Sequence, residues 1–92
     1  ERLCAASGLG HVRNGRFKGG WITRHHADPA GGVHSLQMEL ACRGYMTEPD
    51  TPAPGHWPSP WRPEQAEPLQ MHLRKVLSAC LGFAQAQAGA PP

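Results

Sequence analysis

Proline recurs throughout residues 47–63, and this segment constrains the fold more than any other feature of the chain. Proline has a fixed φ and no backbone N–H, so a segment dense in it suits neither a helix interior nor the centre of a sheet. Its prolines are Pro49, Pro52, Pro54, Pro58, Pro60 and Pro63. Trp57 and Trp61 interrupt the run and are expected to pin it to the protein rather than to bind a ligand. The sequence therefore predicts an extended surface connection between two differently built regions.

The region after this connection has the spacing of an amphipathic helix. Apolar residues recur there every three or four positions, as one face of a helix requires. They are Leu69, Leu73, Val76, Leu77, Cys80 and Ala84. Pro63 or Pro68 suits the first turn, where a missing N–H costs little, while Met71 and Phe83 are expected to pack at the helix edge. We predict one long C-terminal helix over residues 64–87, packed across a sheet.

The region before the connection alternates in polarity as a half-buried strand does. In a strand from Val33 to Ala41, one face would carry Leu36, Met38 and Leu40, and the other Ser35, Gln37 and Glu39. Residues Trp21 to His25 are interpreted as a second, short strand between glycine loops. At Asn14-Gly15 and Gly19-Gly20 the backbone is free to turn tightly or to take positive φ. The predicted fold class is α/β, with a few strands in residues 11–41, a proline-rich loop and one long C-terminal helix.

Size and composition limit how far such a fold could stand alone. A chain of 92 residues with 39% hydrophobic residues, 11 glycines and 10 prolines contains much loop and buries a limited core. A strand with one apolar face needs neighbours, and this chain supplies few. Leu36, Met38 and Leu40 would then remain partly exposed, which favours self-association through the apolar surface. The start at Glu1 instead of methionine also suggests a processed or truncated piece.

Charge, hydropathy and cysteine spacing argue against several classes of function. Nine Lys and Arg against seven Asp and Glu give a formal charge of +2, which is too balanced to attract nucleic acid or an anionic membrane by its field. No run approaches the roughly eighteen apolar residues of a membrane span, and no signal peptide is recognisable. Cys4, Cys42 and Cys80 lie far apart, without the paired spacing of a zinc or redox motif. These observations favour a cytoplasmic protein with free thiols.

Glu39 and the cations between residues 16 and 24 are the candidates for chemistry. Glu39 is either a solvated carboxylate at a strand edge or a general base tuned by burial. Arg24 can hold a substrate carboxylate through paired hydrogen bonds, or it forms a surface salt bridge of little energy. Arg16 and Lys18 lie among glycines and could serve the same end, although exposed cations are common in loops. The residue types alone leave both interpretations open.

His25, His26 and His34 raise the question of a metal site. Their spacing does not reproduce a local zinc motif, in which two histidines lie four apart on a helix with an intervening glutamate. On a strand, the adjacent pair would point to opposite faces, so at most one of them could face a given site. No metal site is therefore predicted within this chain.

Several runs become more informative when they are read together. They are NGRFKGGWITRH at 14–25, GVHSLQMEL at 32–40, and Arg43 with Tyr45-Met46. Across residues 7–46 the chain resembles the C-terminal portion of N-formylglutamate amidohydrolases, also called N-formylglutamate deformylases. It departs from that family at His26-Ala27, where a tyrosine and a glycine are common.

The resemblance implies hydrolysis of N-formyl-L-glutamate to formate and L-glutamate in histidine degradation, by a metal-dependent α/β hydrolase of carboxypeptidase-like architecture. It implies that Glu39 handles the proton and that Arg24 binds the substrate carboxylate, with Thr23, Lys18 and Arg16 as further substrate-binding candidates. It also implies a divalent metal, expected to be zinc, whose ligands belong to an N-terminal region outside this sequence; none is expected on this chain alone. Residues 1–92 would form a partial domain that is inactive by itself.

Two other classes of function compete with this hypothesis. The chain could be a noncatalytic remnant that folds marginally or pairs with another chain. It could also be a small binding module for acidic metabolites that uses Arg24 and Lys18 without catalysis. Metal-dependent turnover separates the hydrolase from both, and carboxylate binding without turnover favours the binding module.

Overall fold

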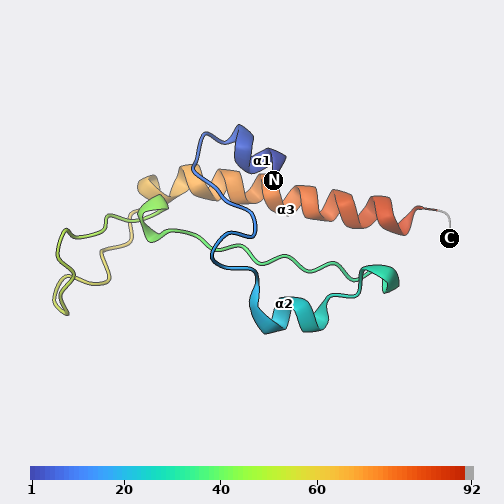
Figure 1. Ribbon diagram of the computed structural model, residues 1–92. Coiled ribbons are helices and arrows are strands. Elements are labelled where there is room, and N and C mark those ends of the chain that lie inside the picture. The colour runs from blue at the N-terminus through green and yellow to red at the C-terminus, as the bar shows by residue number, and fades with distance from the viewer. Residues whose placement is uncertain (91–92) are drawn as a thin grey trace. The chain divides into compact units, whose positions relative to one another are not determined.

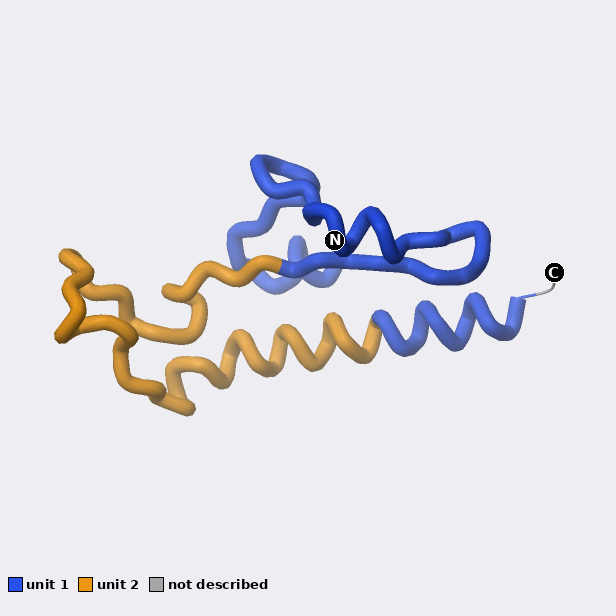
Figure 2. Tube along the Cα trace, turned by 90° about the horizontal axis from the view of Figure 1, so that it is seen from below, with its two compact units in different colours: residues 1–38, 80–92 blue, residues 39–79 orange. Residues whose placement is uncertain are grey.

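The computed structural model describes residues 1–90 and contains helices but no strands in that range. Three α-helices occur in chain order, α1 (Arg2–Ala6), α2 (Gly20–His26) and α3 (Pro63–Ala88) (Figure 1). Two short 3-10 helices lie between α2 and α3, η1 (Pro29–Gly31) and η2 (Cys42–Gly44). The chain divides into two compact units (Figure 2). Unit 1 comprises residues 1–38 with the described residues from Cys80 onward, and unit 2 comprises Glu39–Ala79.

The predicted α/β class is wrong, because neither expected strand forms. Residues 21–25 belong to helix α2, and residues 34–41 belong to no helix or strand. Val33 pairs with Asp28 in an isolated antiparallel bridge, closed by two backbone hydrogen bonds of 2.9 and 2.8 Å. Alternating polarity specifies which face a strand would bury, but a strand also needs a neighbour to accept its hydrogen bonds. Within the described part of the chain, no segment takes that place beside residues 34–41.

The predicted long C-terminal helix is confirmed. Helix α3 begins at Pro63, where the missing N–H has no intrahelical partner to lose, and Pro68 lies inside it. Leu69 is buried at 8% exposure, whereas Leu77 on a later turn is 64% exposed. The apolar stripe is therefore covered at Leu69, half-buried at Leu73 and Val76, and exposed from Leu77 onward. None of the helices in residues 1–90 is both long enough and apolar enough to span a membrane.

Unit 2 contains the buried residues of the described chain, Ala66 and Leu69. Thr47 joins three parts of this unit, because its hydroxyl accepts a 2.8 Å hydrogen bond from Gln65 Nε2 on α3 and its carbonyl accepts one from the Ser59 hydroxyl. Gly44 in η2 lies so close to Leu69 that an added Cβ would stand 3.3 Å from its side chain. The start of α3, η2 and the proline-rich segment are thus tied together locally.

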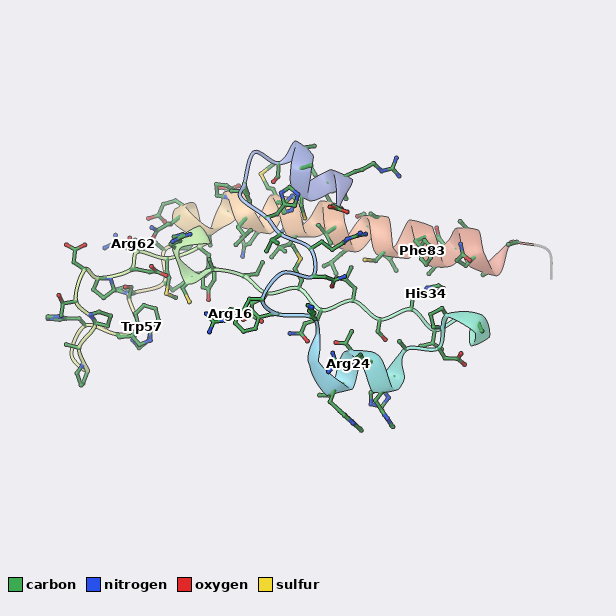
Figure 3. All side chains as sticks on the ribbon, in the orientation of Figure 1. Arg16, Arg24, His34, Trp57, Arg62 and Phe83 are labelled. Atoms are coloured by element: carbon green, nitrogen blue, oxygen red, sulfur yellow. The ribbon has the colours of Figure 1, made fainter. Side chains whose placement is uncertain are left out.

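Unit 1 is held mainly by local polar and aromatic contacts, and neither α1 nor α2 contains a buried residue. Ser7 closes α1, since its hydroxyl donates to the Cys4 carbonyl at 2.6 Å and accepts from the Leu9 N–H at 3.1 Å. The rings of His34 and Phe83 meet edge to face with centroids 4.9 Å apart, and both are labelled in Figure 3. This contact joins the last part of α3 to the segment that follows the Asp28–Val33 bridge.

Candidate functional site

The turn that leads into α2 depends on two glycines. Gly19 and Gly20 have φ of 95° and 69°, in the left-handed region that other residues rarely adopt. A Cβ added to Gly19 would also lie 3.3 Å from Cβ of Thr23. The backbone freedom predicted for this dipeptide is therefore used, and it brings the loop of residues 16–19 close to the side chains of α2.

Arg24 is oriented by this turn. Its Nη1 donates a hydrogen bond to the Lys18 carbonyl at 3.4 Å, so the guanidinium is held beside the glycine turn rather than extended away from it. Arg24 and Lys18 are both exposed, and Figure 3 shows Arg24 on α2. A guanidinium carries five N–H donors, and a single contact of this kind leaves donors for a ligand. The geometry permits carboxylate binding.

Thr23 and Arg16 have different surroundings. The Thr23 hydroxyl donates to Gln37 Oε1 at 3.3 Å, a contact that links α2 to the segment after Val33. Arg16 lies with its guanidinium carbon 5.9 Å from the centroid of the Phe17 ring, at the outer limit of a cation–π contact. Lys18, Thr23 and Arg24 are therefore brought together within unit 1, whereas Arg16 contacts its own neighbour.

Glu39 is the first residue of unit 2. Its side chain is exposed, and within that unit it forms no hydrogen bond or ion pair with a described residue. A general base is normally tuned by burial or by a specific partner. Unit 2 supplies neither to Glu39.

The histidines form an aromatic group that the strand interpretation did not foresee. His25 stacks on Trp21 at 4.1 Å with an interplanar angle of 14°, and His26 meets His25 edge to face at 4.9 Å. The expectation that His25 and His26 point to opposite faces was wrong, because consecutive residues of a helix lie on adjacent parts of its surface. The four-residue spacing of Trp21 and His25 was the signal that could have revealed the stacking.

A divalent metal does not fit the residues that the structure describes. No group of three or more His, Cys, Asp or Glu side chains among them could hold a metal ion. The aromatic group on α2 offers only two imidazoles, and one of these is stacked on Trp21. A structural or catalytic zinc site takes at least three protein ligands.

Comparison with known proteins shows the family to which the segment around α2 belongs. The family model for N-formylglutamate amidohydrolase matches residues 1–46, which is half of the 92-residue chain. The chain belongs to this family. The N-formylglutamate deformylase of Pseudomonas putida is 45% identical over 84 residues, and that of Pseudomonas aeruginosa is 42% identical over 84 residues. Each alignment covers 90% of this chain but only 29% of the relative, and no solved structure gives a significant match.

The candidate site residues lie in the segment that the family model matches. Lys18, Thr23 and Arg24 lie inside the N-formylglutamate amidohydrolase match, and so does Glu39. Both deformylases share a much longer segment with this chain than the family model does, since 84 aligned residues must extend beyond residue 46. The relationship therefore includes at least part of the proline-rich segment and α3.

Near its C-terminal end the family match contains a tyrosine–thiol pair, Tyr45 and Cys42, whose contact was not predicted from the sequence. The Tyr45 hydroxyl donates to Cys42 Sγ at 3.6 Å across the turn of η2. This hydrogen bond, followed by the electrostatic influence of Cys42 and by partial burial, raises the pKa of Tyr45 above its ordinary value of 10.0. The three-residue spacing on a short helical turn brings the two groups together.

Proposed function

We propose that this chain forms the C-terminal part of a hydrolase of the N-formylglutamate deformylase type. The reaction would add water across the formyl amide of N-formyl-L-glutamate and release formate and L-glutamate. The observation that carries the proposal is the Arg24–Lys18 arrangement at the glycine turn, within a segment matched by the family model. The proposed reaction is that of the two Pseudomonas relatives, both N-formylglutamate deformylases.

Arg24 is assigned to the substrate carboxylate. The guanidinium fork matches a carboxylate with two parallel N–H···O hydrogen bonds, and the Lys18 carbonyl limits the directions in which the fork can point. Lys18 and Arg16 add positive charge on the same loop, and the Thr23 hydroxyl, whose proton is donated to Gln37, can still accept a hydrogen bond. Because N-formylglutamate carries two carboxylates, several cations near one turn suit it.

Glu39 is assigned to proton transfer. It would take a proton from the attacking water and deliver it to the nitrogen of the departing amine, as a general base that becomes a general acid. This role requires surroundings that unit 2 does not provide, so we propose that the complete site is assembled with protein outside this chain. The family resemblance implies a divalent metal, expected to be zinc, and we assign its ligands to that other part; no step here depends on it.

The chain by itself is therefore proposed to be inactive. Turnover requires the attacking water, the general base and the group that binds the substrate carboxylate to lie within hydrogen-bond reach of one another. This chain offers Arg24 for the carboxylate and an exposed Glu39, but not a complete site. The parent reaction would belong to histidine degradation in the cytoplasm, where the three cysteines could persist as thiols.

A chimeric enzyme tests the proposal. The 84-residue segment of the Pseudomonas putida deformylase that aligns with this chain is replaced by the corresponding residues of this chain, and formate release is measured. We expect the chimera to hydrolyse N-formyl-L-glutamate. Glu39→Gln in it should lower kcat by roughly 10²-fold or more, because general-base assistance contributes about that much. Arg24→Ala should lower kcat/KM by about 10- to 100-fold, the worth of a charge-assisted hydrogen bond.

Glu67→Gln and Arg62→Ala provide matched controls, since both change charge in or beside α3 and should leave kcat/KM within about twofold, as surface substitutions usually do. A chimera that folds but keeps full kcat with Gln at position 39 would remove Glu39 from the mechanism. Formate release by the isolated 92-residue chain, lost on Glu39→Gln, would overturn its proposed inactivity. Binding of glutamate without turnover in the chimera would favour the carboxylate-binding module.

A further inference from the structure

A hollow of about 390 Å³ lies in unit 2, beside the proline-rich segment. It is lined by Cys42, Glu48, Pro49, Pro52 and Trp57. The volume falls at the lower end of the range of small-ligand sites, about 300–1,000 Å³. Two proline rings, an indole and a thiol make most of its wall apolar, and Glu48 is the one charged residue in it. The hollow has no part in the proposed hydrolysis.

The segment that forms the wall is tethered at both ends. Thr47 directly precedes Glu48, and its hydroxyl is held by Gln65 Nε2 at 2.8 Å. Ser59, two residues after Trp57, donates to the Thr47 carbonyl. Pro49 and Pro52 further restrict the backbone between these anchors. Glu48 and Trp57 are therefore positioned by the same local network, which reduces the entropy that a ligand must offset to bind between them.

The charge of the hollow is negative and uncompensated within the described part of unit 2. Glu48 forms no ion pair there, and the ion pair found among the described residues joins Arg13 to Glu1 in unit 1. The proline-rich segment, residues 47–63, contains two acidic residues, Glu48 and Asp50, and one arginine, Arg62, which does not line the hollow. An anionic substrate such as N-formylglutamate would be repelled from this place, whereas a cation would be attracted.

We infer that this hollow binds a small organic ammonium ion with aliphatic arms. The cationic head is attracted by the Glu48 carboxylate and by the face of the Trp57 indole, the aromatic ring best suited to cation–π contact. Its methyl or methylene groups fit against Pro49 and Pro52, which present apolar rings. Trp57 then does more than pin the loop, which is the role that its place among prolines first suggested. The inference stands independently of the deformylase proposal.

The experiment is an NMR titration of the full chain with choline. The indole N–H signal of Trp57 is identified by its loss in Trp57→Phe, and its movement is followed as choline is added. We expect a saturable shift with a dissociation constant on the order of millimolar, because exposed cation–π and ion-pair contacts are individually weak. The neutral analogue 3,3-dimethylbutan-1-ol has the same shape without the charge and should bind at least about fivefold more weakly.

Glu48→Gln should weaken choline binding by about fivefold, the effect of one exposed ion pair. Asp50→Asn is the matched control, since it removes the same charge from the same segment at a residue outside the wall; it should change the constant by less than about twofold. If Glu48→Gln also displaces the Trp61 and Gln65 signals of the free protein, the substitution has altered the local structure. The affinities of the unaltered chain for choline and for the neutral alcohol then decide whether the charge contributes to binding. Absence of a saturable shift, equal binding of the alcohol, or an equal loss in Asp50→Asn would overturn the inference.

Discussion

The turn before α2, which lies in the family match, and the beginning of α3 keep their local conformations in different ways. At the start of α3, Ala66 and Leu69 are 1% and 8% exposed and pack within unit 2. Around α2, the large apolar side chains stay in solvent, with Trp21 at 66% and Leu36 at 75% exposure. The turn keeps its local geometry through positive-φ glycines and short-range hydrogen bonds instead of a core. Conformation at the candidate site is thus specified locally, and no buried side chain of α1 or α2 contributes to its stability.

The largest expected effect contrasts two leucines of one helix. Leu69→Ala should destabilise the packed start of α3 by about 2 kcal/mol, because it removes a buried side chain and leaves a cavity. Leu77→Ala, at an exposed position on the same helix, should change stability by no more than about 0.5 kcal/mol. Urea unfolding followed by helical circular dichroism measures both. Equal losses would mean that the later turns of α3 are also buried in solution.

Gly19→Ala tests whether the turn before α2 is maintained by its backbone. A φ of 95° and a Thr23 neighbour only 3.3 Å from the new Cβ should together cost about 1–2 kcal/mol. Gly10→Ala is the control, since an added Cβ there meets nothing within 4 Å and its φ is not positive. Amide hydrogen exchange of Thr23 and Arg24 reports on the turn. Unchanged protection in Gly19→Ala would show that α2 forms without it.

Thr47→Val should have a smaller effect, about 1 kcal/mol, because it deletes the hydroxyl that accepts the Gln65 hydrogen bond and preserves the side-chain volume. Thr51→Val is the control within the same segment. The chemical shift of the Gln65 side-chain amide measures the contact directly. If that signal moves as much in Thr51→Val as in Thr47→Val, the network assigned to Thr47 does not hold the proline-rich segment.

The sequence predicted those features that a segment determines by itself. Apolar residues recur at helical spacing along most of α3, so the predicted bounds, 64–87, differ by one residue at each end from the observed Pro63–Ala88. The positive φ of Gly19 and Gly20 followed from residue type. The strand predicted over residues 34–41 does not form, because a strand needs a second segment to pair with. Alternating polarity in one segment does not show whether that second segment is present.

The strand prediction for residues 21–25, which belong to helix α2, was wrong for another reason. Five residues with Trp, Ile and Thr favour a strand by propensity, and only the stacking of Trp21 on His25 and the preceding glycine turn favour a helix. The contact of Arg24 with the Lys18 carbonyl follows from that turn, so it could not be read from the sequence. Arg24, Thr23 and Lys18 were selected by residue type and family resemblance, and their mutual geometry came from the fold.

The smallest predicted effect concerns Tyr45, which is the one tyrosine of the chain, so tyrosinate absorbance reads it alone. Its pKa is raised by the hydrogen bond to Cys42 Sγ and by the electrostatic influence of Cys42, so the native state keeps a proton that the unfolded state has lost above pH 10.0. Between 10.0 and the folded pKa the native state binds more protons, and the contribution of this pair to stability is lost as pH rises. Cys42→Ala should return the pKa toward 10.0, whereas Cys80→Ala, at an exposed thiol, should leave it raised. A midpoint that does not move in Cys42→Ala would mean that the Tyr45 hydroxyl does not donate to Cys42 Sγ in solution, and that the η2 turn is closed by its backbone hydrogen bonds.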